Sequence, residues 1–337
     1  MPEHDGPSLD SRFAGSVGRA SATIEGSDVT VSTLAAGPPG AVGFIGLGNM
    51  GGRMSRCIVR AGGQVLGYDA NPDVIAGAGA LPGASVAEVA RSCDVVLMSL
   101  PDSHVVESVV LGPGGVLSQA RPGQVVVDLS TSAPESTRRI YALLADKQAE
   151  YLDAGISGGA AAADAGKLTL MVGGDQAALE KVRPTLAAFT ANLYHVGATG
   201  AGHATKLLNN FLNAVSLAAT AEVMVAGKKA GLDLALLLEV FNKSSGINFA
   251  TLNRFPKIIT GDYLEGGLTN TLMMKDVVLY TEMISQLGVA SLNASGPLAS
   301  FGLARSLGYA DQISNTVVDA IGDVSGGVRL YDNLEPH

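Results

Sequence analysis

Short, continuous apolar runs alternate with helical patterns along the first part of the chain. The first run is 41–45, Ala-Val-Gly-Phe-Ile, and others follow at 64–69, 94–100 and 124–128. Because their hydrophobicity is continuous rather than alternating, they favour strands of a parallel sheet that is covered on both faces. Helical segments lie between them, for example 134–147, which begins with proline in its first turn. This alternation of strands and helices predicts a doubly wound α/β domain.

The pattern changes near residue 200. Further strands are expected before that point, at 150–153, 168–172 and 192–196. After it the strand signals stop, and helices are expected at 201–229, 232–242 and 272–287, with two more toward the C-terminus. Glycines just past these periodic segments indicate where the helices stop.

We therefore expect a Rossmann-type domain over residues 41–200 and an all-helical domain over 201–337. Residues 1–40 are rich in Gly, Ser, Thr, Ala and Pro and lack the apolar core of a signal peptide. They are expected to form a disordered leader, and an unprocessed start-site extension is an equal alternative. The predicted helix 201–229 is longer than a small domain needs, so it is also a candidate for linking subunits.

Composition and charge narrow the class of protein. The chain has 337 residues, enough for two domains, and a net charge of −9 with no run rich in lysine or arginine. Nucleic acid and anionic membrane surfaces are therefore poor partners. No apolar run reaches the roughly 18 residues that a membrane helix requires. Two cysteines without a CxxC motif and five scattered histidines make a metal site unexpected and favour a cytoplasmic location.

A glycine motif follows the first strand. Gly46, Gly48 and Gly51 form GxGxxG between that strand and a helix, the context in which the motif binds a dinucleotide. The first glycine permits the turn, the second lets the pyrophosphate approach the backbone, and the third packs helix against strand. The helix N-terminus adds N–H donors and a positive dipole end. The cofactor contacts expected in this loop are Gly46, Leu47, Gly48, Asn49, Met50 and Gly51.

Asp69 stands at the end of the second strand, about 20 residues after the motif. Its carboxylate is expected to hydrogen-bond the ribose hydroxyls and to repel a 2′-phosphate. Neither Ala70 nor Asn71 is an arginine that would hold such a phosphate. NAD is therefore favoured over NADP. The alternative is that Asp69 only caps the turn before Asn71-Pro72.

The segment 128–134, Asp-Leu-Ser-Thr-Ser-Ala-Pro, closes a strand and enters a helix. Hydroxyl groups at the carboxyl end of a strand lie where open α/β sheets bind ligands, which makes the hydroxyls of this segment candidate ligand contacts. The alternative is that Ser132 or a neighbour caps the next helix.

Ser157, Gly158 and Gly159 follow the strand 150–153. Successive N–H groups on a Gly-Gly turn can form an anion-binding nest, and the serine adds a donor. Such a site suits the carboxylate of a substrate. The alternative is a flexible glycine turn without a ligand.

Lys206 and Asn210 are four residues apart and share one face of the long predicted helix. A lysine beside glycines at the start of a helix can transfer protons if burial tunes its pKa. The alternative for a helical lysine is a solvated surface charge, which apolar neighbours such as Leu207 argue against. His203 and His195 are expected to be structural or peripheral.

In this order the motifs resemble the 3-hydroxyisobutyrate dehydrogenase-like β-hydroxyacid dehydrogenases. The resemblance extends from about residue 41 to near the C-terminus. It rests on the segments 43–51, 128–134, 157–159, 168–174 and 197–210, and on Lys275-Asp276. It implies a Rossmann-type domain, a 6-phosphogluconate-dehydrogenase-like all-α domain and a cleft between them. Members of the family are usually dimers or tetramers built through the helical domain.

The resemblance also implies roles for individual residues. Lys206 would be the catalytic residue. The substrate would be contacted by Ser130, Ser157, Gly158, Gly159 and Asn210. The cofactor would be contacted, beyond the glycine loop and Asp69, by Leu100, Pro101, Thr131 and Lys275, the last two near the nicotinamide. From its sequence alone, Lys275-Asp276 is equally compatible with a solvated helix start.

Two departures from the family pattern flank the substrate loop. Residues 153–156 are Asp-Ala-Gly-Ile where Asp-Ala-Pro-Val is usual, and residue 162 is alanine where glycine is usual. Both bear on the identity of the substrate, as does the segment 242–248.

The resulting hypothesis is a reversible, NAD-linked oxidation of a small 3-hydroxy acid to its aldehyde or ketone, with Lys206 exchanging the hydroxyl proton. The substrate would carry a carboxylate, of the 3-hydroxyisobutyrate or tartronate semialdehyde type, and the enzyme would be a homodimer or homotetramer. An imine reductase is an alternative with the same architecture, but such enzymes usually replace the lysine with an acid or tyrosine. A non-catalytic, NAD-binding oligomeric module is the alternative from another class.

Overall fold

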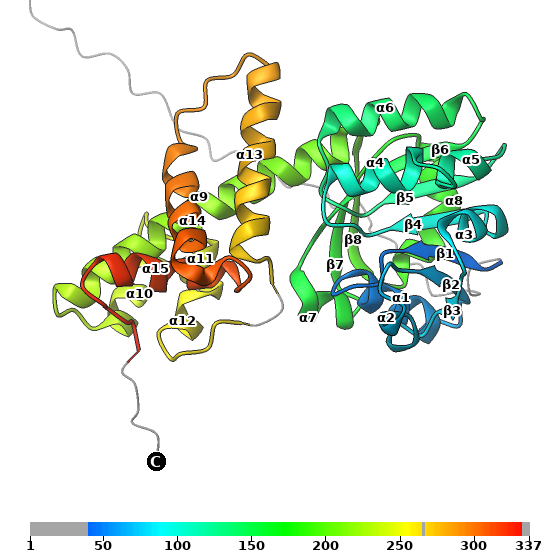
Figure 1. Ribbon diagram of the computed structural model, residues 1–337. Coiled ribbons are helices and arrows are strands. Elements are labelled where there is room, and N and C mark those ends of the chain that lie inside the picture. The colour runs from blue at the N-terminus through cyan, green and yellow to red at the C-terminus, as the bar shows by residue number, and fades with distance from the viewer. Residues whose placement is uncertain (1–39, 265–266, 332–337) are drawn as a thin grey trace, which may run out of the picture. The chain divides into compact units, whose positions relative to one another are not determined.

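The computed structural model describes residues 40–264 and 267–331. The predicted leader lies outside this described part, apart from its last residue, Gly40. Figure 1 shows an α/β domain built around one sheet, followed along the chain by a helical domain. None of the helices in the described ranges is long and apolar enough to cross a membrane.

Eight strands form one sheet in the order β3-β2-β1-β4-β5-β6-β7-β8. Their bounds are β1 Val42–Ile45, β2 Val65–Tyr68, β3 Leu81–Pro82, β4 Val95–Met98, β5 Val125–Asp128, β6 Glu150–Ser157, β7 Leu168–Gly173 and β8 Thr190–Gly197. The strand order reverses at β1, which pairs with both β2 and β4. Open α/β sheets bind ligands at such a point, outside the carboxyl ends of the strands. The glycine motif follows β1 at this point.

The sheet is mostly parallel, and one pair of strands differs. β6 and β7 pair antiparallel, with Ser157 opposite Thr169. The connection between them runs only from Gly158 to Lys167, whereas a parallel crossover needs about a dozen residues or more. A short apolar run has the same hydrophobicity in either direction, so the sequence pattern did not distinguish the two arrangements.

Helices cover both faces of the sheet (Figure 1). Val125 and Val127 of β5 pack in one core with α1, α7 and α8, while Val126 packs in the other with α3 to α6. This alternation along a strand buried on both sides explains its continuous hydrophobicity. The bounds are α1 Gly51–Arg60, α2 Asp73–Gly77, α3 Val86–Ser92, α4 Ser103–Leu111, α5 Val116–Gln119, α6 Pro134–Ala145, α7 Gly159–Asp164 and α8 Gln176–Ala187.

The helical domain is built around α9, Ala201–Lys229, which has the predicted bounds. Near its start α9 packs against β6 and β7, and further along it packs against α13, α14 and α15. The other elements are α10 Leu234–Asn242, α11 Phe249–Asn253, α12 Phe255–Ile258, α13 Asn270–Gln286, α14 Ser295–Ala304, η1 Arg305–Tyr309, η2 Ser314–Thr316 and α15 Val317–Val324. The helices α11 and α12 were not expected, because each is too short to show a helical period.

Candidate active site

The glycine loop after β1 has the geometry of a dinucleotide site. Gly46 has a φ of +87°, and a Cβ there would collide with the carbonyl oxygen of Ser99. A Cβ on Gly51 would collide with the carbonyl oxygen of Gly46. A Cβ on Gly48 would meet no atom within 4 Å, so the loop is open at the position where a pyrophosphate must approach the backbone. The residues present therefore fit the phosphates of NAD.

The first turn of α1 is suited to an anion. Its N-cap residue, Met50, makes no side-chain hydrogen bond to the helix, and the first turn contains no acidic residue. The dipole of a helix places partial positive charge at this end. One of the cofactor contacts predicted in the glycine loop, the backbone N–H of Leu47, already has an acceptor, because it donates to Asp69 Oδ2 at 2.7 Å.

Asp69 lies directly after β2 and joins two loops. Its second carboxylate oxygen, Oδ1, accepts a hydrogen bond from the Asn71 N–H at 2.8 Å, which is the turn contact expected as the alternative. The contact to Leu47 shows that the carboxylate also lies against the glycine loop. Each oxygen accepts one bond here and has a further lone pair, so the carboxylate retains acceptor capacity for ribose hydroxyls.

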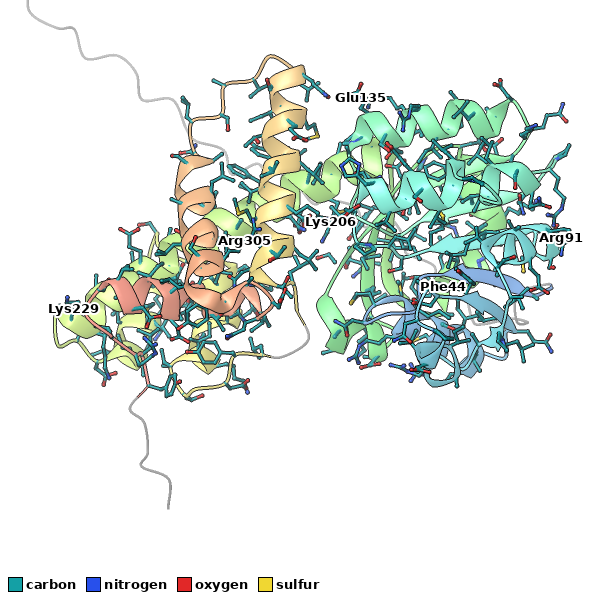
Figure 2. All side chains as sticks on the ribbon, viewed as in Figure 1. Phe44, Arg91, Glu135, Lys206, Lys229 and Arg305 are labelled. Atoms are coloured by element: carbon teal, nitrogen blue, oxygen red, sulfur yellow. The ribbon has the colours of Figure 1, made fainter. Side chains whose placement is uncertain are left out.

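Lys206 lies in the second turn of α9 and is 7% exposed. Figure 2 labels it on this helix, beside α13. Burial lowers the pKa of Lys206 to about 8; the carboxylate of Asp276 acts in the opposite direction, and the charge of Lys275 lowers it further. No described residue accepts a hydrogen bond from the Lys206 amine. A buried lysine near this pKa can exchange a proton at neutral to mildly alkaline pH.

Asp276 on α13 is the main residue that sequence reasoning missed. It is 1% exposed and accepts a short hydrogen bond from Asn210 Nδ2, while its Oδ1 has no hydrogen-bond partner. It also lies close enough to Lys206 to raise the pKa of that lysine. The only sequence signal was its position next to Lys275. The structure thus brings Lys206 and Asn210 of α9 together with Lys275 and Asp276 of α13.

Lys275 connects α13 to the ends of two strands. Its ammonium donates to the carbonyl oxygen of Pro101 at 3.0 Å and to that of Thr131 at 3.1 Å, and lies 3.3 Å from Asp276 Oδ1. The loop after β4 is also tied to the loop after β5, because Leu100 N–H donates to Ser130 Oγ at 2.9 Å. The cofactor and substrate contacts expected in these loops are therefore assembled in one place, although the Lys275 ammonium is already hydrogen-bonded to the protein.

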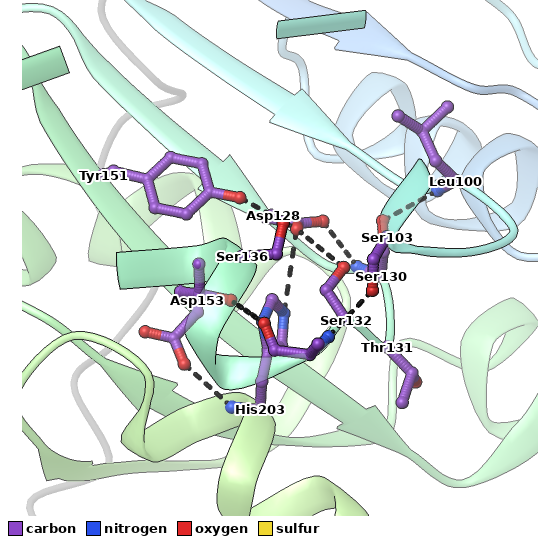
Figure 3. A network of polar contacts seen from close by, with 12 residues as sticks. Leu100, Ser103, Asp128, Ser130, Thr131, Ser132, Ser136, Tyr151, Asp153 and His203 are labelled. Atoms are coloured by element: carbon purple, nitrogen blue, oxygen red, sulfur yellow. Dashed lines mark hydrogen bonds and ion pairs between the residues drawn. The ribbon is translucent and has the colours of Figure 1, made fainter. Parts of the chain in front are cut away.

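A buried polar network supports the Ser130 loop (Figure 3). Asp128, at the end of β5, is 0% exposed and accepts hydrogen bonds from Ser130 N–H at 2.9 Å, Tyr151 OH at 2.9 Å and Ser132 Oγ at 3.3 Å. His203 Nε2 lies 3.8 Å from the same carboxylate. Burial, and next the charge of Asp128, raise the pKa of Tyr151 well above its usual range, so its hydroxyl stays a donor.

The structure bears on one alternative and one expectation from the sequence. Ser132 does not cap α6, whose N-cap is Ala133 and has no side-chain capping bond. Instead the Ser132 hydroxyl donates to Asp128. His203 is structural, as expected, since it is fully buried and its Nδ1 lies 2.7 Å from the Thr137 hydroxyl.

The start of α9 is fixed by a buried carboxylate in β6. Asp153 accepts hydrogen bonds from Gly200 N–H at 2.7 Å and from His203 N–H at 2.8 Å. A Cβ on Gly202 would collide with the carbonyl oxygen of Asp153, so the helix and the strand touch through their backbones. Asp153 therefore caps the helix and sets the depth at which Lys206 enters the site.

The predicted substrate turn follows β6. Gly155 faces Lys206, and Ser157 is two residues further, hence on the same face of the strand. Gly158 and Gly159 have φ values of 132° and 70°, which only glycine adopts readily. Among the described residues none hydrogen-bonds the Ser157 hydroxyl. The turn is thus a defined structure with a free donor on the side of Lys206.

Helix α7, which begins at Gly159, is anchored to the cofactor helix α1. Arg53 and Arg56 of α1 form ion pairs with Asp164, and Arg60 donates to the carbonyl oxygen of Asp164 at 2.6 Å. Alanine at position 162 has a structural consequence, because a Cβ on Gly158 would lie 2.7 Å from the Cβ of Ala162. The turn before α7 therefore requires glycine in this chain.

Two family profiles match the chain, one over the α/β domain and one over most of the helical domain. Residues 41–197 match the NAD binding domain of 6-phosphogluconate dehydrogenase. Residues 200–318 match the NAD-binding domain of NADP-dependent 3-hydroxyisobutyrate dehydrogenase. The fold and the site therefore define a nicotinamide-dependent oxidoreductase with a Rossmann-type domain and a helical domain.

Curated relatives narrow the class. A 2-(hydroxymethyl)glutarate dehydrogenase of Eubacterium barkeri is 40% identical, over 72% of this chain and 81% of the relative. An NAD-dependent L-serine dehydrogenase of Pseudomonas aeruginosa is 38% identical, over 80% of this chain and 94% of the relative. A 3-hydroxyisobutyrate dehydrogenase of Pseudomonas aeruginosa is 36% identical, over 79% of this chain and 90% of the relative.

Solved structures agree with these relatives. A Mycobacterium tuberculosis 3-hydroxyisobutyrate dehydrogenase with L-serine superposes with a TM-score of 0.75 at 31% identity, over 83% of this chain and 98% of that one. An imine reductase from Pseudomonas sp. shares only the fold, with a TM-score of 0.53 at 18% identity. The chain belongs to the β-hydroxyacid dehydrogenase family, and it is an NAD-dependent enzyme that acts on the hydroxyl group of hydroxy acids.

Proposed function

We propose that this enzyme reversibly oxidises a small 3-hydroxy acid of the form HOCH₂–CH(X)–COO⁻ to the corresponding aldehyde, with Lys206 as the proton-transfer residue. The observation that carries the proposal is the buried Lys206 amine, with its pKa lowered to about 8, beside Asn210 and Asp276. NAD supplies the acceptor for the hydride that leaves the carbinol carbon. The hydroxyl proton goes to the amine of Lys206.

Lys206 acts as the base in the oxidation and as the acid in the reduction. With a pKa near 8, about a tenth of the amine is neutral at pH 7, against less than a thousandth for an ordinary lysine. Asp276 limits this fall in pKa, so the ammonium form remains available to protonate the product in the reverse reaction. The chain therefore supplies both protonation states near neutral pH.

Asn210 and the Ser157 turn would orient the substrate. The hydrogen bond to Asp276 fixes the Asn210 amide and leaves one of its two N–H bonds for a substrate oxygen. The free Ser157 hydroxyl, with the N–H groups of Gly158 and Gly159, would bind the substrate carboxylate. Ser130 would add a further contact, since its hydroxyl accepts from Leu100 and can still donate.

The relatives indicate what varies in the substrate. The compounds in their names, 3-hydroxyisobutyrate, serine and 2-(hydroxymethyl)glutarate, share the HOCH₂–CH(X)–COO⁻ unit and differ in X. We infer that this enzyme recognises the same unit through Lys206, Asn210 and the Ser157 turn. The group X would then decide which acid it uses.

The test is NADH formation by the purified protein with NAD and a panel of these acids, repeated with NADP and with the variants Lys206→Ala and Lys206→Met. We expect lysine-dependent turnover of one acid of this form, while NAD binding is retained in both variants. Equal turnover in the wild type and both variants would overturn the role of Lys206. Binding of NAD without turnover of any acid in the panel would favour the non-catalytic alternative.

We also propose that the enzyme is a homodimer or homotetramer assembled through the helical domain of residues 201–337, and that it works in the cytoplasm. Exposed large apolar side chains gather on this domain, among them Leu208, Leu212, Leu236, Phe249, Leu252 and Leu292. Both cysteines are free and buried, which fits a reducing compartment. Light scattering coupled to size exclusion would test the assembly, and a monomer at micromolar concentration would overturn it.

A further inference from the structure

One face of α9 carries a row of polar side chains that begins at the catalytic lysine. Lys206, Asn210 and Asn213 follow each other at spacings of four and three residues, which keeps them on one face of a helix. Seven residues of helix rise about 10 Å. The row therefore extends two turns along α9 from Lys206 into the helical domain.

Arg254, just after α11, meets the far end of this row. Its Nη2 donates to Asn213 Oδ1 at 3.0 Å, and its Nη1 donates to Asn315 Oδ1 at 2.7 Å. Its guanidinium carbon lies 5.7 Å from the centre of the Phe249 ring. The side chain is partly exposed, so it is accessible as well as held in place. Three of the five guanidinium N–H bonds remain for another acceptor.

The charge of Arg254 is not balanced inside the protein. Burial lowers the pKa of Arg254 to about 10, and no carboxylate of the described residues acts in the opposite direction. Arg329, the other partly buried arginine of this domain, differs: its guanidinium lies 2.5 Å from Asp323 and 3.7 Å from Asp319. A half-buried cation with only neutral partners is electrostatically incomplete, and an anion would complete it.

We propose that Arg254 is a second anion subsite of the active site and binds a carboxylate at the far end of the group X of the substrate. The preferred substrate is then a dicarboxylate that carries the HOCH₂–CH(X)–COO⁻ unit. This inference rests on the proposed function, because Lys206 defines the reacting end. An arginine fork suits a carboxylate, since two parallel N–H bonds match its two oxygens.

The length of such a substrate is similar to the rise of about 10 Å along α9 from residue 206 to residue 213. In 2-(hydroxymethyl)glutarate four carbon–carbon bonds, about 5 Å when extended, separate the carbinol carbon from the distal carboxylate carbon. Contacts of about 3 Å at the lysine and at the arginine bring the span to about 10 Å. With X reduced to a methyl group, as in 3-hydroxyisobutyrate, the substrate would leave Arg254 without an anionic partner.

The test compares these two acids, which differ only in X. Each is titrated calorimetrically into the NADH-loaded enzyme, where an alcohol binds without turnover. We expect the wild type to bind 2-(hydroxymethyl)glutarate at least about tenfold more tightly than 3-hydroxyisobutyrate. In Arg254→Gln this ratio of Kd values should fall by about tenfold, and Arg254→Lys should restore part of it. Arg329→Gln is the matched control, in which the ratio should stay at the wild-type value.

A second variant separates recognition from folding. Asn213→Asp gives Arg254 an internal carboxylate partner, so we expect a higher Tm together with the loss of the tenfold preference. If Arg254 served only to hold α11 against α9, the ratio of Kd values for the two acids would be the same in Asn213→Asp as in the wild type. That result would overturn the proposal. So would equal affinity of the wild type for the two acids. If the wild type bound neither acid, the proposed function itself would fail.

Discussion

The Cβ of Lys206 lies only 2.5 Å from where a Cβ on Gly155 would stand, so α9 packs against the one position of β6 that has no side chain. In this backbone arrangement residue 155 has no room for a Cβ. Because α9 and β6 also touch through Gly202 and Asp153, a local shift of the helix would break the hydrogen bond from Gly200 N–H to Asp153 that caps it. The position of the lysine is therefore determined by the backbone.

Gly155→Ala should displace Lys206 and lower turnover more than stability. A shift of about 1 Å at a reacting group can cost about a hundredfold in rate, so we expect kcat to fall by about ten- to a hundredfold. Steady-state kinetics and thermal unfolding would be measured together. Gly302→Ala on α14 is the control, because a Cβ there meets no atom within 4 Å and the residue is helical. Full activity of Gly155→Ala would show that the contact is not needed.

The rate of oxidation should rise with pH, with a midpoint near 8. Oxidation requires the neutral amine of Lys206, whose pKa burial lowers to about 8, whereas reduction requires the ammonium and should fall over the same range. The measurement is the pH profile of kcat/KM in both directions. A profile for oxidation with no inflection between pH 7 and 9 would contradict the assignment.

Asp276→Asn should move that midpoint to lower pH. The Asp276 carboxylate raises the pKa of Lys206, so its neutralisation removes the force that opposes burial. Asparagine keeps a similar size and can still accept a hydrogen bond from Asn210. The shift would be read from the same kcat/KM profile. A midpoint that moved upward would mean that Asp276 acts on the lysine in another way.

Asp69→Ser should weaken the preference for NAD. The variant loses the carboxylate contacts to the ribose and the repulsion of a 2′-phosphate, so kcat/KM for NAD should fall by about tenfold while the gap to NADP narrows. Asp73→Ala is a control, because that acid is exposed in the first turn of α2, four residues after Asp69. An unchanged ratio of the two cofactors would argue that Asp69 only maintains the turn through its bond to Asn71.

Asp153→Asn should destabilise the fold as well as the site. Asp153 is fully buried and accepts two N–H groups at the start of α9, so weakening this cap should cost about 1–3 kcal/mol. Chemical denaturation would give the free energy of unfolding. Asp233→Ala removes the exposed cap of α10 and should cost about 1 kcal/mol. Similar decreases in the free energy of unfolding for the two variants would mean that the burial of Asp153 does not strengthen its cap.

The sequence by itself determined the elements whose signals are local. Continuous apolar runs located most of the strands, the GxGxxG spacing located the cofactor loop, and the helical period between Gly200 and Gly231 gave the bounds of α9. These features depend on residues that are near each other along the chain. The family resemblance added the order of the motifs and hence the class of enzyme.

Only the tertiary structure decided which distant residues meet. Asp276 lies 66 positions from Asn210, and Arg254 lies 41 from Asn213, so no local period connects either pair. The lowered pKa of Lys206 follows from its burial once α9 packs against β6 and α13, which a helical pattern cannot quantify. The antiparallel pairing of β7 follows from a short connection rather than from apolar character. Local periodicity specifies elements, whereas burial and charge partners arise only once those elements pack together.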